Sequence, residues 1–405
     1  MAATTDVIII GSGGFGAATA YELARRGQRV TVLDRFAIAS QTSPRAAGLA
    51  STVRRTDLMT GLAMRAARSL IEFADDTGVD LGIVKSGSLK ITRSELYVDG
   101  LDLDLEMGRR HAIDIERISA ADAARLNPLL DPGGIVDVLR IPTDIYFEPS
   151  QVAISFATAA AEKGARLVPH NPVTAVRCSA GRVVGVDTLQ GPIDAPVVID
   201  AAGAWAAQVA ALAGHRVPVV PMRHQLVITE PLAGVRADLP IVRIIDVAVY
   251  VRPSWGGLLV GGYETTPLDI DMAAQQPDFE IRDTPLDLAV IQRLIDLVVP
   301  QLPILRGARF RVHRGGVPTM TVDGQHIVDE VPGAEGMFVA AGCNASGLSI
   351  SPAIGQLLAE WVVDGAPSVD LSPMSITRFG PKWADDATVL TAARNQYVAF
   401  YHSTI

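Results

Sequence analysis

The segment Asp6-Val-Ile-Ile-Ile-Gly-Ser-Gly-Gly-Phe-Gly16 constrains the fold of this chain more than any other part of the sequence. Its apolar start is typical of a buried parallel strand, and its glycines have the GxGxxG spacing of a turn that holds a dinucleotide pyrophosphate. Gly11 allows the tight turn, Gly13 lets backbone N–H groups approach phosphate oxygens, and Gly16 lets the next helix pack closely on the strand. The phosphates would lie at the positive end of that helix.

The residues after the turn complete a strand–helix–strand unit. Small and apolar side chains recur at helical spacing, Gly27 ends the helix, and Arg29 to Leu33 is a second strand. Asp34 follows at the ~20-residue offset where an acid accepts hydrogen bonds from the hydroxyl groups of an adenosine ribose. The alternative is a glycine turn that binds no nucleotide, but it does not explain the helix, the second strand and the acid together.

Bulk composition excludes several classes of protein. The net charge of −9 comes without the local lysine and arginine excess that nucleic-acid binding needs. No apolar run reaches the ~18 residues of a membrane span, and Met1 to Asp6 lacks the basic start of a signal peptide. Cys178 and Cys343 are too few for a disulfide framework, and the seven histidines show no metal-ligand spacing. We therefore expect a soluble, cytoplasmic protein with no metal, nucleic-acid or membrane partner.

The chain is long enough for two packed domains. Apolar strands that enter small-residue turns recur at Pro196 to Gly203 and Gly336 to Gly342, whereas residues 217–320 alternate as antiparallel strands do. The predicted fold is α/β (α+β overall), with a Rossmann-like cofactor-binding domain and an inserted mixed or antiparallel-sheet substrate domain. The expected boundaries are 1–85, 145–215 and 315–370 for the first domain, 86–144 and 216–314 for the second, and 371–405 for a C-terminal helical extension.

The late return of nucleotide-like strands favours FAD over NAD, since an NAD enzyme would complete its nucleotide unit within about one ordinary domain. Cys343 to Gly355 follows the last such strand, with Ser351 as the expected N-cap and Pro352 as the first helical residue. A helix N-terminus there would stabilise the negative charge of a reduced flavin. A surface glycine turn before an ordinary amphipathic helix is the alternative.

Over nearly its whole length the chain resembles the glycine oxidase and sarcosine oxidase group of D-amino-acid oxidase-like, FAD-dependent amine oxidoreductases. The matching segments occur in family order: Gly11 to Gly16, Ala46-Ala-Gly48, Ser86-Gly-Ser-Leu, Val198 to Trp205, Gly257 to Glu264, Thr319 to Gly324 and Ala340 to Gly347. Ala46-Ala-Gly-Leu49, Arg223 to Glu230 and Asn344-Ala-Ser-Gly347 are most similar to the dimethylglycine and sarcosine dehydrogenase branch, which oxidises N-methyl or secondary amines. The sequence ends at Ile405, before that branch's folate-binding extension, so formaldehyde capture on folate is expected to need another protein.

The resemblance also identifies where a covalent flavin would attach. One branch uses a histidine just before Ala-Ala-Gly, where this chain has Arg45, and another uses a cysteine at the position of Gly316. Cys343 lies near the flavin by family position but matches neither attachment point. We therefore expect a dissociable, non-covalent FAD.

The motifs and the resemblance together give a set of cofactor-binding candidates. Val173 is expected to lend backbone groups to the adenine, and Trp205 to pack against adenosine or the core. The full set is Gly11, Gly13, Gly14, Phe15, Gly16, Asp34, Arg35, Ser43, Arg45, Ala46, Ala47, Gly48, Val173, Ala202, Gly203, Trp205, Gly316, Gly342, Asn344, Ser346, Gly347, Leu348 and Ser349.

The resemblance implies an arginine that pairs with a substrate carboxylate, and Arg54 matches best, with Arg55 close behind. A surface arginine pair is the alternative. Two family lysines are replaced: the carboxylate partner by Ser349, and the oxygen-activating lysine by Leu259 or Val260. Both replacements leave the substrate and the electron acceptor open.

His224, Tyr250 and Arg252 are the remaining catalytic candidates, because they lie on predicted strands whose counterparts face the flavin in relatives. They could orient the substrate or lower the proton affinity of its amine. A structural histidine and a packing tyrosine are the alternatives. Glu264 is expected either to bind an ammonium group or to cap a turn.

These features predict an FAD-dependent oxidoreductase that removes hydride beside a C–N bond of a secondary or tertiary amine, such as an N-alkyl amino acid, giving an imine that hydrolyses. The acceptor would be oxygen or an electron-transfer protein. Three alternatives remain: a primary amino acid, opine or non-carboxylate amine as substrate; a non-catalytic FAD-binding subunit; and an NAD-only dehydrogenase. Homo- or hetero-oligomers stay open, because the cluster of Tyr397, Phe400 and Tyr401 could contact a partner or pack on its own chain.

Overall fold

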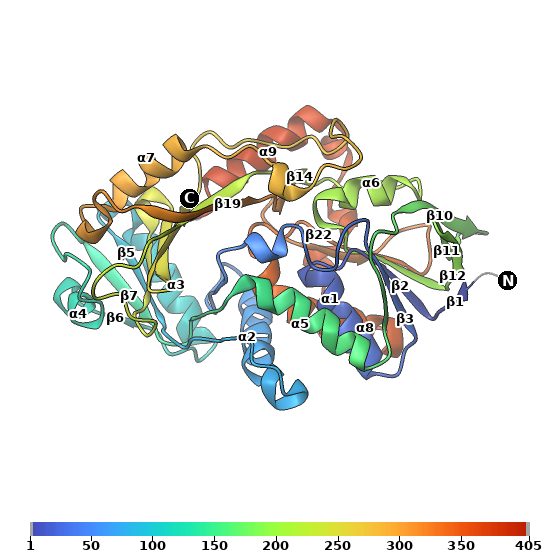
Figure 1. Cartoon of the computed structure of the whole chain (residues 1–405), viewed down its shortest axis with the longest axis horizontal. Helices are drawn as coiled ribbons and strands as arrows, with labels where there is room; N and C mark the ends of the chain where they lie inside the picture. Colours follow the sequence, from blue (N-terminus) through green and yellow to red (C-terminus); the bar gives the residue numbers. More distant parts are fainter. Residues whose placement is uncertain (1–2, 402–405) are drawn as a thin grey trace.

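The computed structural model describes residues 3–401, so the first two residues of the predicted cofactor-binding domain and the last four of the predicted C-terminal extension lie outside it. Two large sheets divide the molecule (Figure 1). The first has six strands in the order β21 (Ile327–Glu330), β22 (Met337–Ala341), β13 (Val197–Asp200), β2 (Val7–Ile10), β3 (Val30–Leu33) and β9 (Arg166–Val168). All neighbours are parallel except β21 and β22, so the central strands form a Rossmann-like sheet.

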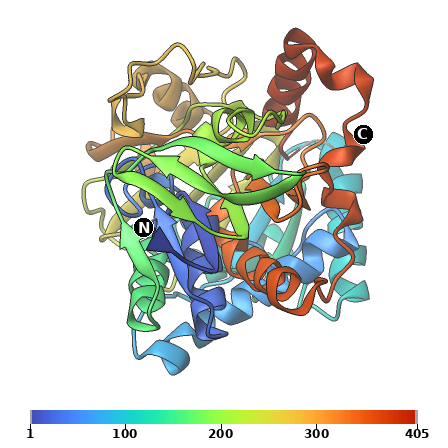
Figure 2. The same ribbon diagram turned by 90° about the vertical axis from the view of Figure 1, so that its right-hand side faces the viewer.

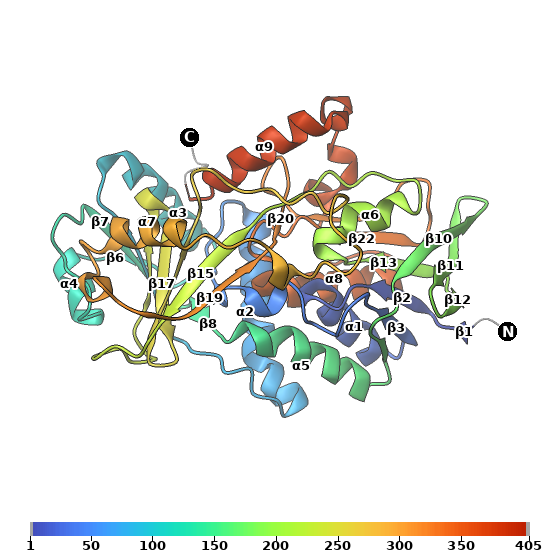
Figure 3. The ribbon, with the colours of Figure 1, turned by 45° about the horizontal axis from the view of Figure 1, so that its top comes forward.

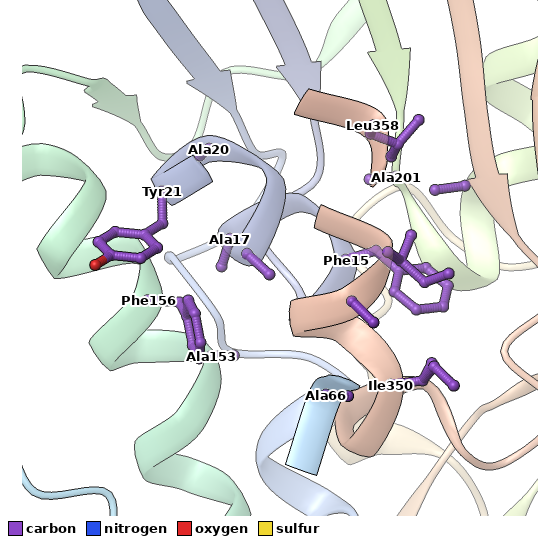
Figure 4. Close-up of a cluster of buried hydrophobic side chains, with 14 of the residues drawn as sticks. Phe15, Ala17, Ala20, Tyr21, Ala66, Ala153, Phe156, Ala201, Ile350 and Leu358 are labelled. Carbon is purple, nitrogen blue, oxygen red and sulfur yellow. The ribbon is translucent and has the colours of Figure 1, made fainter. Parts of the chain in front are cut away.

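Strand β2 is buried on both faces, which explains its unbroken apolar sequence. Val7 and Ile9 pack towards the helical layer, whereas Ile8 and Ile10 pack towards a second layer of strands. The helical layer contains α1 (Gly14–Arg25), α2 (Asp57–Thr77), α5 (Pro149–Glu162) and α8 (Gly347–Asp364). Helix α1 packs closely against both α5 and α8, because the alanines on its surface, including Ala17 and Ala20, are small (Figure 4).

The opposite face of the parallel sheet is covered by α6 (Ala206–Ala211) and a small sheet. The small sheet has the order β1 (Ala3–Thr4), β12 (Gly191–Asp194), β11 (Arg182–Thr188) and β10 (Val173–Ser179). It lies at the right-hand end of the molecule in Figure 1 and faces the viewer in Figure 2. This part of the chain is therefore a three-layer arrangement.

The second large sheet has eight strands, and Figure 3 shows its strands at the other end of the molecule. Their order is β19 (Phe310–Gly316), β15 (His224–Thr229), β18 (Gly257–Gly262), β17 (Val249–Ser254), β16 (Ile241–Ile244), β5 (Ser88–Thr92), β7 (Asp137–Ile141) and β6 (Glu116–Arg117). Only β16 and β5 pair in parallel, so the sheet is mixed. The predicted α/β fold with a Rossmann-like sheet and a second, mixed sheet is confirmed. The exact domain boundaries stay a prediction.

The remaining elements connect or cover these sheets. They are the strand pairs β14 (Val220–Pro221) with β20 (Thr319–Met320) and β4 (Leu49–Ala50) with β8 (Ile145–Tyr146), and the helices α3 (Val98–Arg110), α4 (Ala120–Leu126), α7 (Leu288–Val298) and α9 (Asp386–Val398). Within residues 3–401, no helix is both long and apolar enough to cross a membrane.

The predicted start of the helix after β22 is wrong. Helix α8 begins at Gly347, so Ser351 is not an N-cap and Pro352 lies inside the helix. Proline cannot donate to the carbonyl four residues earlier, which belongs to Leu348. The Ser351 hydroxyl donates to that carbonyl at 2.9 Å, so its hydrogen bond is replaced and the helix continues.

Candidate active site

A cavity of about 870 Å³ collects residues from both large sheets. Its walls include the glycine loop after β2, the residue after β3, the segment before α2, the start of α8 and one face of the eight-stranded sheet. Nearly all of the predicted cofactor and substrate residues line this cavity. Gly16, Gly342 and Arg252 do not.

The glycine loop requires glycine at two positions, Gly16 behind the cavity wall and Gly11 on it. A Cβ on Gly16 would lie 1.9 Å from the carbonyl oxygen of Gly11, so no side chain fits there. Gly11 itself has φ +101°, and a Cβ would meet the carbonyl oxygen of Ala201 at 2.5 Å. By contrast, Gly14 lines the cavity, and its N–H donates to the Ser43 hydroxyl at 2.9 Å. This places the first turn of α1, whose N–H groups lack intrahelical acceptors, at the cavity.

Asp34 lies at the same end of the cavity and holds the glycine loop. Its carboxylate accepts from the Ser12 backbone N–H at 2.9 Å, from the Ser12 hydroxyl and from the Phe36 N–H at 2.8 Å. Burial raises the pKa of Asp34 despite these donors. Arg35 stacks on Phe36 and on Trp205, with its guanidinium carbon 5.3 Å from the centre of the Trp205 ring. This end therefore combines hydroxyl-binding and stacking groups suited to an adenosine.

Ser43, Ala46, Ala47, Gly48, Val173, Ala202 and Gly203 also line the cavity, as do Asn344, Ser346, Gly347 and Leu348 at the start of α8. Gly342 lies behind the wall, where a Cβ would meet the Thr321 methyl carbon at 2.4 Å. The Asn344 side-chain oxygen accepts from the Thr321 N–H at 3.0 Å. These contacts shape the backbone that leads into α8.

Arg54 lines the cavity just before α2. Its guanidinium donates to the Ser349 hydroxyl at 3.4 Å, while its Nε is buried without a hydrogen-bond partner among residues 3–401. Over the same residues, Arg54 forms no ion pair with a carboxylate. Burial, and then repulsion from Arg243, lower the pKa of Arg54. A buried cation with unused donors favours an anionic ligand.

Alternate side chains along the strands of the eight-stranded sheet face the cavity. On β16, Val242 and Ile244 pack against α7, so Arg243 faces the cavity; on β17, Tyr250 does the same. Arg243 and Tyr250 are direct neighbours across the two strands. Gly261 on β18 leaves room for Tyr250, because a Cβ there would lie 2.4 Å from the phenol oxygen.

His224 connects this face to the C-terminal helix. Its Nε2 lies 2.8 Å from the Tyr250 hydroxyl and its Nδ1 lies 2.8 Å from the Tyr397 hydroxyl. Burial lowers the pKa of His224 to about 4, so the ring is neutral near pH 7. Sequence analysis missed the next ring, Tyr263, whose centre lies 4.8 Å from that of His224 and which also lines the cavity.

Arg243 is a second residue that the sequence analysis missed. It forms a buried ion pair with Asp144 at 2.8 Å, and Asp144 also accepts from the Ser88 hydroxyl at 2.7 Å. The signal was present in Ile241-Val-Arg-Ile244, since a charged residue inside a fully apolar strand is paired or functional.

Two predictions need correction. Arg252 does not reach the cavity, because its guanidinium donates to the carbonyl oxygens of Ala47 at 2.7 Å and Phe147 at 3.3 Å. Glu264 neither meets the cavity nor caps a turn. It is buried, pairs with Arg223 at 2.6 Å and accepts from Gln225 at 3.1 Å, so its charge is already balanced.

His326 is a further cavity residue that the sequence did not reveal. It is 1% exposed, and neither ring nitrogen has a hydrogen-bond partner among the described residues. Burial lowers its pKa to about 3. Such an orphaned imidazole, together with the glycine loop and the Arg54 Nε, fits a polar ligand that extends along the cavity. The residues present therefore fit FAD.

The three candidate positions for covalent flavin attachment, Arg45, Gly316 and Cys343, all line the cavity. Arg45 donates to the carbonyl oxygens of Ser40 and Gln41, and Gly316 lies nearby, since its Cβ would be 3.7 Å from the Arg45 Cβ. Cys343 is a free thiol on the cavity wall, and burial raises its pKa, which opposes thiolate formation.

A Rossmann-like sheet whose glycine turn opens on a cavity shared with a second sheet defines a dinucleotide-dependent enzyme. The chain belongs to the FAD dependent oxidoreductase family, DAO, whose model matches residues 6–361. It is therefore an oxidoreductase and its cofactor is FAD. This confirms the family resemblance and the cofactor prediction, and it excludes the NAD-only alternative.

Three relatives illustrate the range of this family. The human mitochondrial sarcosine dehydrogenase is 30% identical over 98% of this chain and 45% of its own length. The mouse mitochondrial pyruvate dehydrogenase phosphatase regulatory subunit is 28% identical over 93% of this chain and 43% of its own length. The chain thus spans less than half of these two relatives. The crystal structure of glycine oxidase from Geobacillus kaustophilus superposes with a TM-score of 0.83 at 27% identity and covers 93% of this chain and 100% of that one.

Proposed function

We propose that this protein oxidises the C–N bond of a secondary or tertiary amine that carries a carboxylate, such as an N-alkyl amino acid. Arg54 is the observation that carries the proposal. It is a guanidinium at the cavity, with a buried Nε that donates to nothing among residues 3–401 and no carboxylate partner there. A substrate carboxylate would supply both the missing acceptor and the missing charge.

The neighbouring rings suit the amine end of the same substrate. His224, Tyr250 and Tyr263 line the cavity, and the pKa of Arg54 is influenced by Tyr263, which places that ring near the guanidinium. A carboxylate on Arg54 would therefore hold an adjacent N-alkyl group against aromatic faces, which favour apolar and cationic groups. The sarcosine dehydrogenase relative is named for a substrate of this kind.

The chemistry then divides between the bound FAD and this chain's residues. When bound, FAD would supply a hydride acceptor for the carbon beside the amine nitrogen. Arg54 fixes the carboxylate, and neutral His224 holds the Tyr250 hydroxyl, so the substrate is oriented without an additional cation beside its amine. Loss of hydride leaves an iminium ion, and water hydrolyses it to an aldehyde and the dealkylated amine. The final acceptor of the two electrons would be oxygen or an electron-transfer protein.

We further propose that the FAD is held without a covalent bond. Arg45 has no nucleophilic side chain, Gly316 has none at all, and the Cys343 thiol is held protonated by its raised pKa. Acid precipitation of the purified protein should release yellow FAD into the supernatant. Colour that stays in the pellet would contradict this proposal.

The test of the function is anaerobic mixing of the FAD-loaded protein with sarcosine, dimethylglycine and carboxylate-free amines of the same size, with flavin absorbance as readout. We expect bleaching by an amine that carries a carboxylate. Replacement of Arg54 by Met should raise the apparent Kd of that amine by at least about 100-fold, which is the equivalent of a lost charged hydrogen-bond pair. The matched control is Arg236→Met, since Arg236 is exposed and, among residues 3–401, pairs only with Asp238.

Two other results would redirect the proposal. Bleaching by carboxylate-free amines, unaffected in Arg54→Met, would show that Arg54 does not bind substrate. An oxidised spectrum with every amine would favour a non-catalytic FAD-binding subunit; the mouse relative is named as a regulatory subunit.

A further inference from the structure

The residues after helix α9 form part of the cavity wall. Phe400 and Tyr401 follow the end of α9 at Val398, and both line the cavity beside Tyr263. Helix α9 itself lies along the top of the molecule in Figure 3 and packs on β14 and β20. The aromatic cluster seen in the sequence therefore packs on its own chain, at the site.

Two arginines of the site hold this segment in place. Arg55 donates to the backbone carbonyl oxygens of Ala399, at 3.3 Å, and of Phe400. The Tyr401 hydroxyl hydrogen-bonds Arg243, whose charge is balanced by Asp144. The two arginines belong to parts of the chain far from this segment in sequence. Their hydrogen bonds therefore fix the segment in one position at the cavity.

The rings of the segment complete an aromatic wall. Phe400 stacks on Tyr263 with ring centres 4.2 Å apart and an interplanar angle of 12°. Tyr401 meets Tyr263 edge-on at 5.7 Å and Phe400 at 5.3 Å. Stacked and edge-on contacts of this kind hold rings in fixed orientations. Tyr263 and Tyr401 both interact electrostatically with Arg54, so this wall lies near its guanidinium.

From this geometry we infer that Phe400 and Tyr401 are specificity-determining residues: the Phe400 ring limits the size of the amine substituent to a small alkyl group, and Tyr401 positions Arg243 beside the carboxylate site. The inference rests on the proposed function and narrows its substrate class to amino acids with an N-methyl or similarly small substituent. The two residues have separable effects. Phe400 limits the size of the amine substituent, whereas the Tyr401 hydroxyl fixes the position of the charged Arg243 side chain.

The test uses FAD-loaded wild type, Phe400→Ala, Phe400→Leu and Tyr401→Phe, with Trp255→Ala as control. Trp255 is an aromatic residue that is 50% exposed and lies away from the cavity, at the turn between β17 and β18. Two readouts are measured: flavin absorbance shifts with acetate, butyrate and benzoate, which report binding without turnover, and anaerobic bleaching by N-methyl-, N-ethyl- and N-propylglycine. Unchanged FAD affinity and melting temperature would show that each variant is folded.

We expect Phe400→Ala to raise the N-propyl to N-methyl ratio of kcat/KM by about tenfold or more, the scale of one or two methylenes in an apolar pocket, and to tighten benzoate relative to acetate. Phe400→Leu should show a smaller shift. Tyr401→Phe should weaken the binding of acetate, butyrate and benzoate about equally. Size ratios that stay at wild-type values in Phe400→Ala, or that change as much in Trp255→Ala, would overturn the inference. If the acids respond as expected but no amine bleaches the flavin, the proposed reaction is wrong, whereas the role of Phe400 and Tyr401 in ligand binding is supported.

Discussion

His224 Nε2 lies 2.8 Å from the Tyr250 hydroxyl, and its Nδ1 lies the same distance from the Tyr397 hydroxyl. One ring therefore joins the eight-stranded sheet to helix α9, and both nitrogens are already occupied. This geometry leaves His224 no free nitrogen with which to take a proton from substrate, and we propose that the residue has an orienting role.

The pKa of His224, lowered by burial to about 4, leads to a pH prediction. In the unfolded chain the imidazole binds a proton near pH 6.5, so stability that depends on neutral His224 is present above that pH and is lost as the pH falls towards 4. The stability difference between wild type and His224→Gln should shrink over this window in urea titrations. The acid and base limbs of kcat/KM between pH 6 and 9 should be the same in both proteins. A limb that disappears in His224→Gln would contradict the orienting role.

Gly16 should tolerate no side chain. A Cβ would lie 1.9 Å from the Gly11 carbonyl oxygen, so Gly16→Ala must displace the phosphate-binding turn. We expect loss of FAD from the purified protein, measured by flavin absorbance per mole of chain. Gly61→Ala is the control, because Gly61 lies in α2 with open space around it. It should retain FAD and gain up to about 1 kcal/mol of helix stability.

The Arg223–Glu264 pair should be a large contributor to stability. Both side chains are buried and their closest atoms are 2.6 Å apart, so Glu264→Gln leaves a buried, uncompensated guanidinium. We expect the free energy of unfolding to fall by about 3–5 kcal/mol in urea denaturation. Asp238→Asn, which removes the exposed partner of Arg236, should have no measurable effect. Equal, small effects of both substitutions would show that Glu264 is not needed to balance Arg223.

Asp200 should make the protein less stable at alkaline pH. One carboxylate oxygen accepts from the Ala202 N–H at 3.0 Å, the other has no partner among the described residues, and burial raises the pKa to about 8. Because the unfolded chain loses this proton near pH 3.8, the folded state loses stability relative to the unfolded state as the pH rises from about 4 to about 8.

The non-titrating variant Asp200→Asn keeps the Ala202 hydrogen bond and isolates this effect. Its stability relative to wild type should increase by roughly 1 kcal/mol per pH unit within that window, measured by urea denaturation at pH 5, 7 and 9. A difference that is independent of pH would mean that Asp200 is ionised in the folded protein.

Local sequence patterns predicted the parts of the structure that depend on neighbouring residues. The Gly11 to Gly16 spacing identified the strand, the turn and helix α1, because the backbone of that short segment leaves no room for a side chain at Gly11 or Gly16. The same reasoning failed at Ser351 and Pro352. Their residue types are typical of a helix start, but a side-chain hydrogen bond to Leu348 lets the helix pass through them.

The sequence by itself determined the dinucleotide-binding unit and the existence of a second sheet, since glycine spacing and hydrophobic alternation are local and follow from backbone geometry. The order of its motifs and their family resemblance indicated the FAD-dependent class. Only the tertiary structure decided which side chains share the cavity. Arg252 has the same period as Tyr250 on β17 but ends on the carbonyl groups of Ala47 and Phe147, outside the cavity. Arg243 and Tyr401 meet there from segments more than 150 residues apart, a contact that depends on strand register and helix packing and that no local pattern encodes.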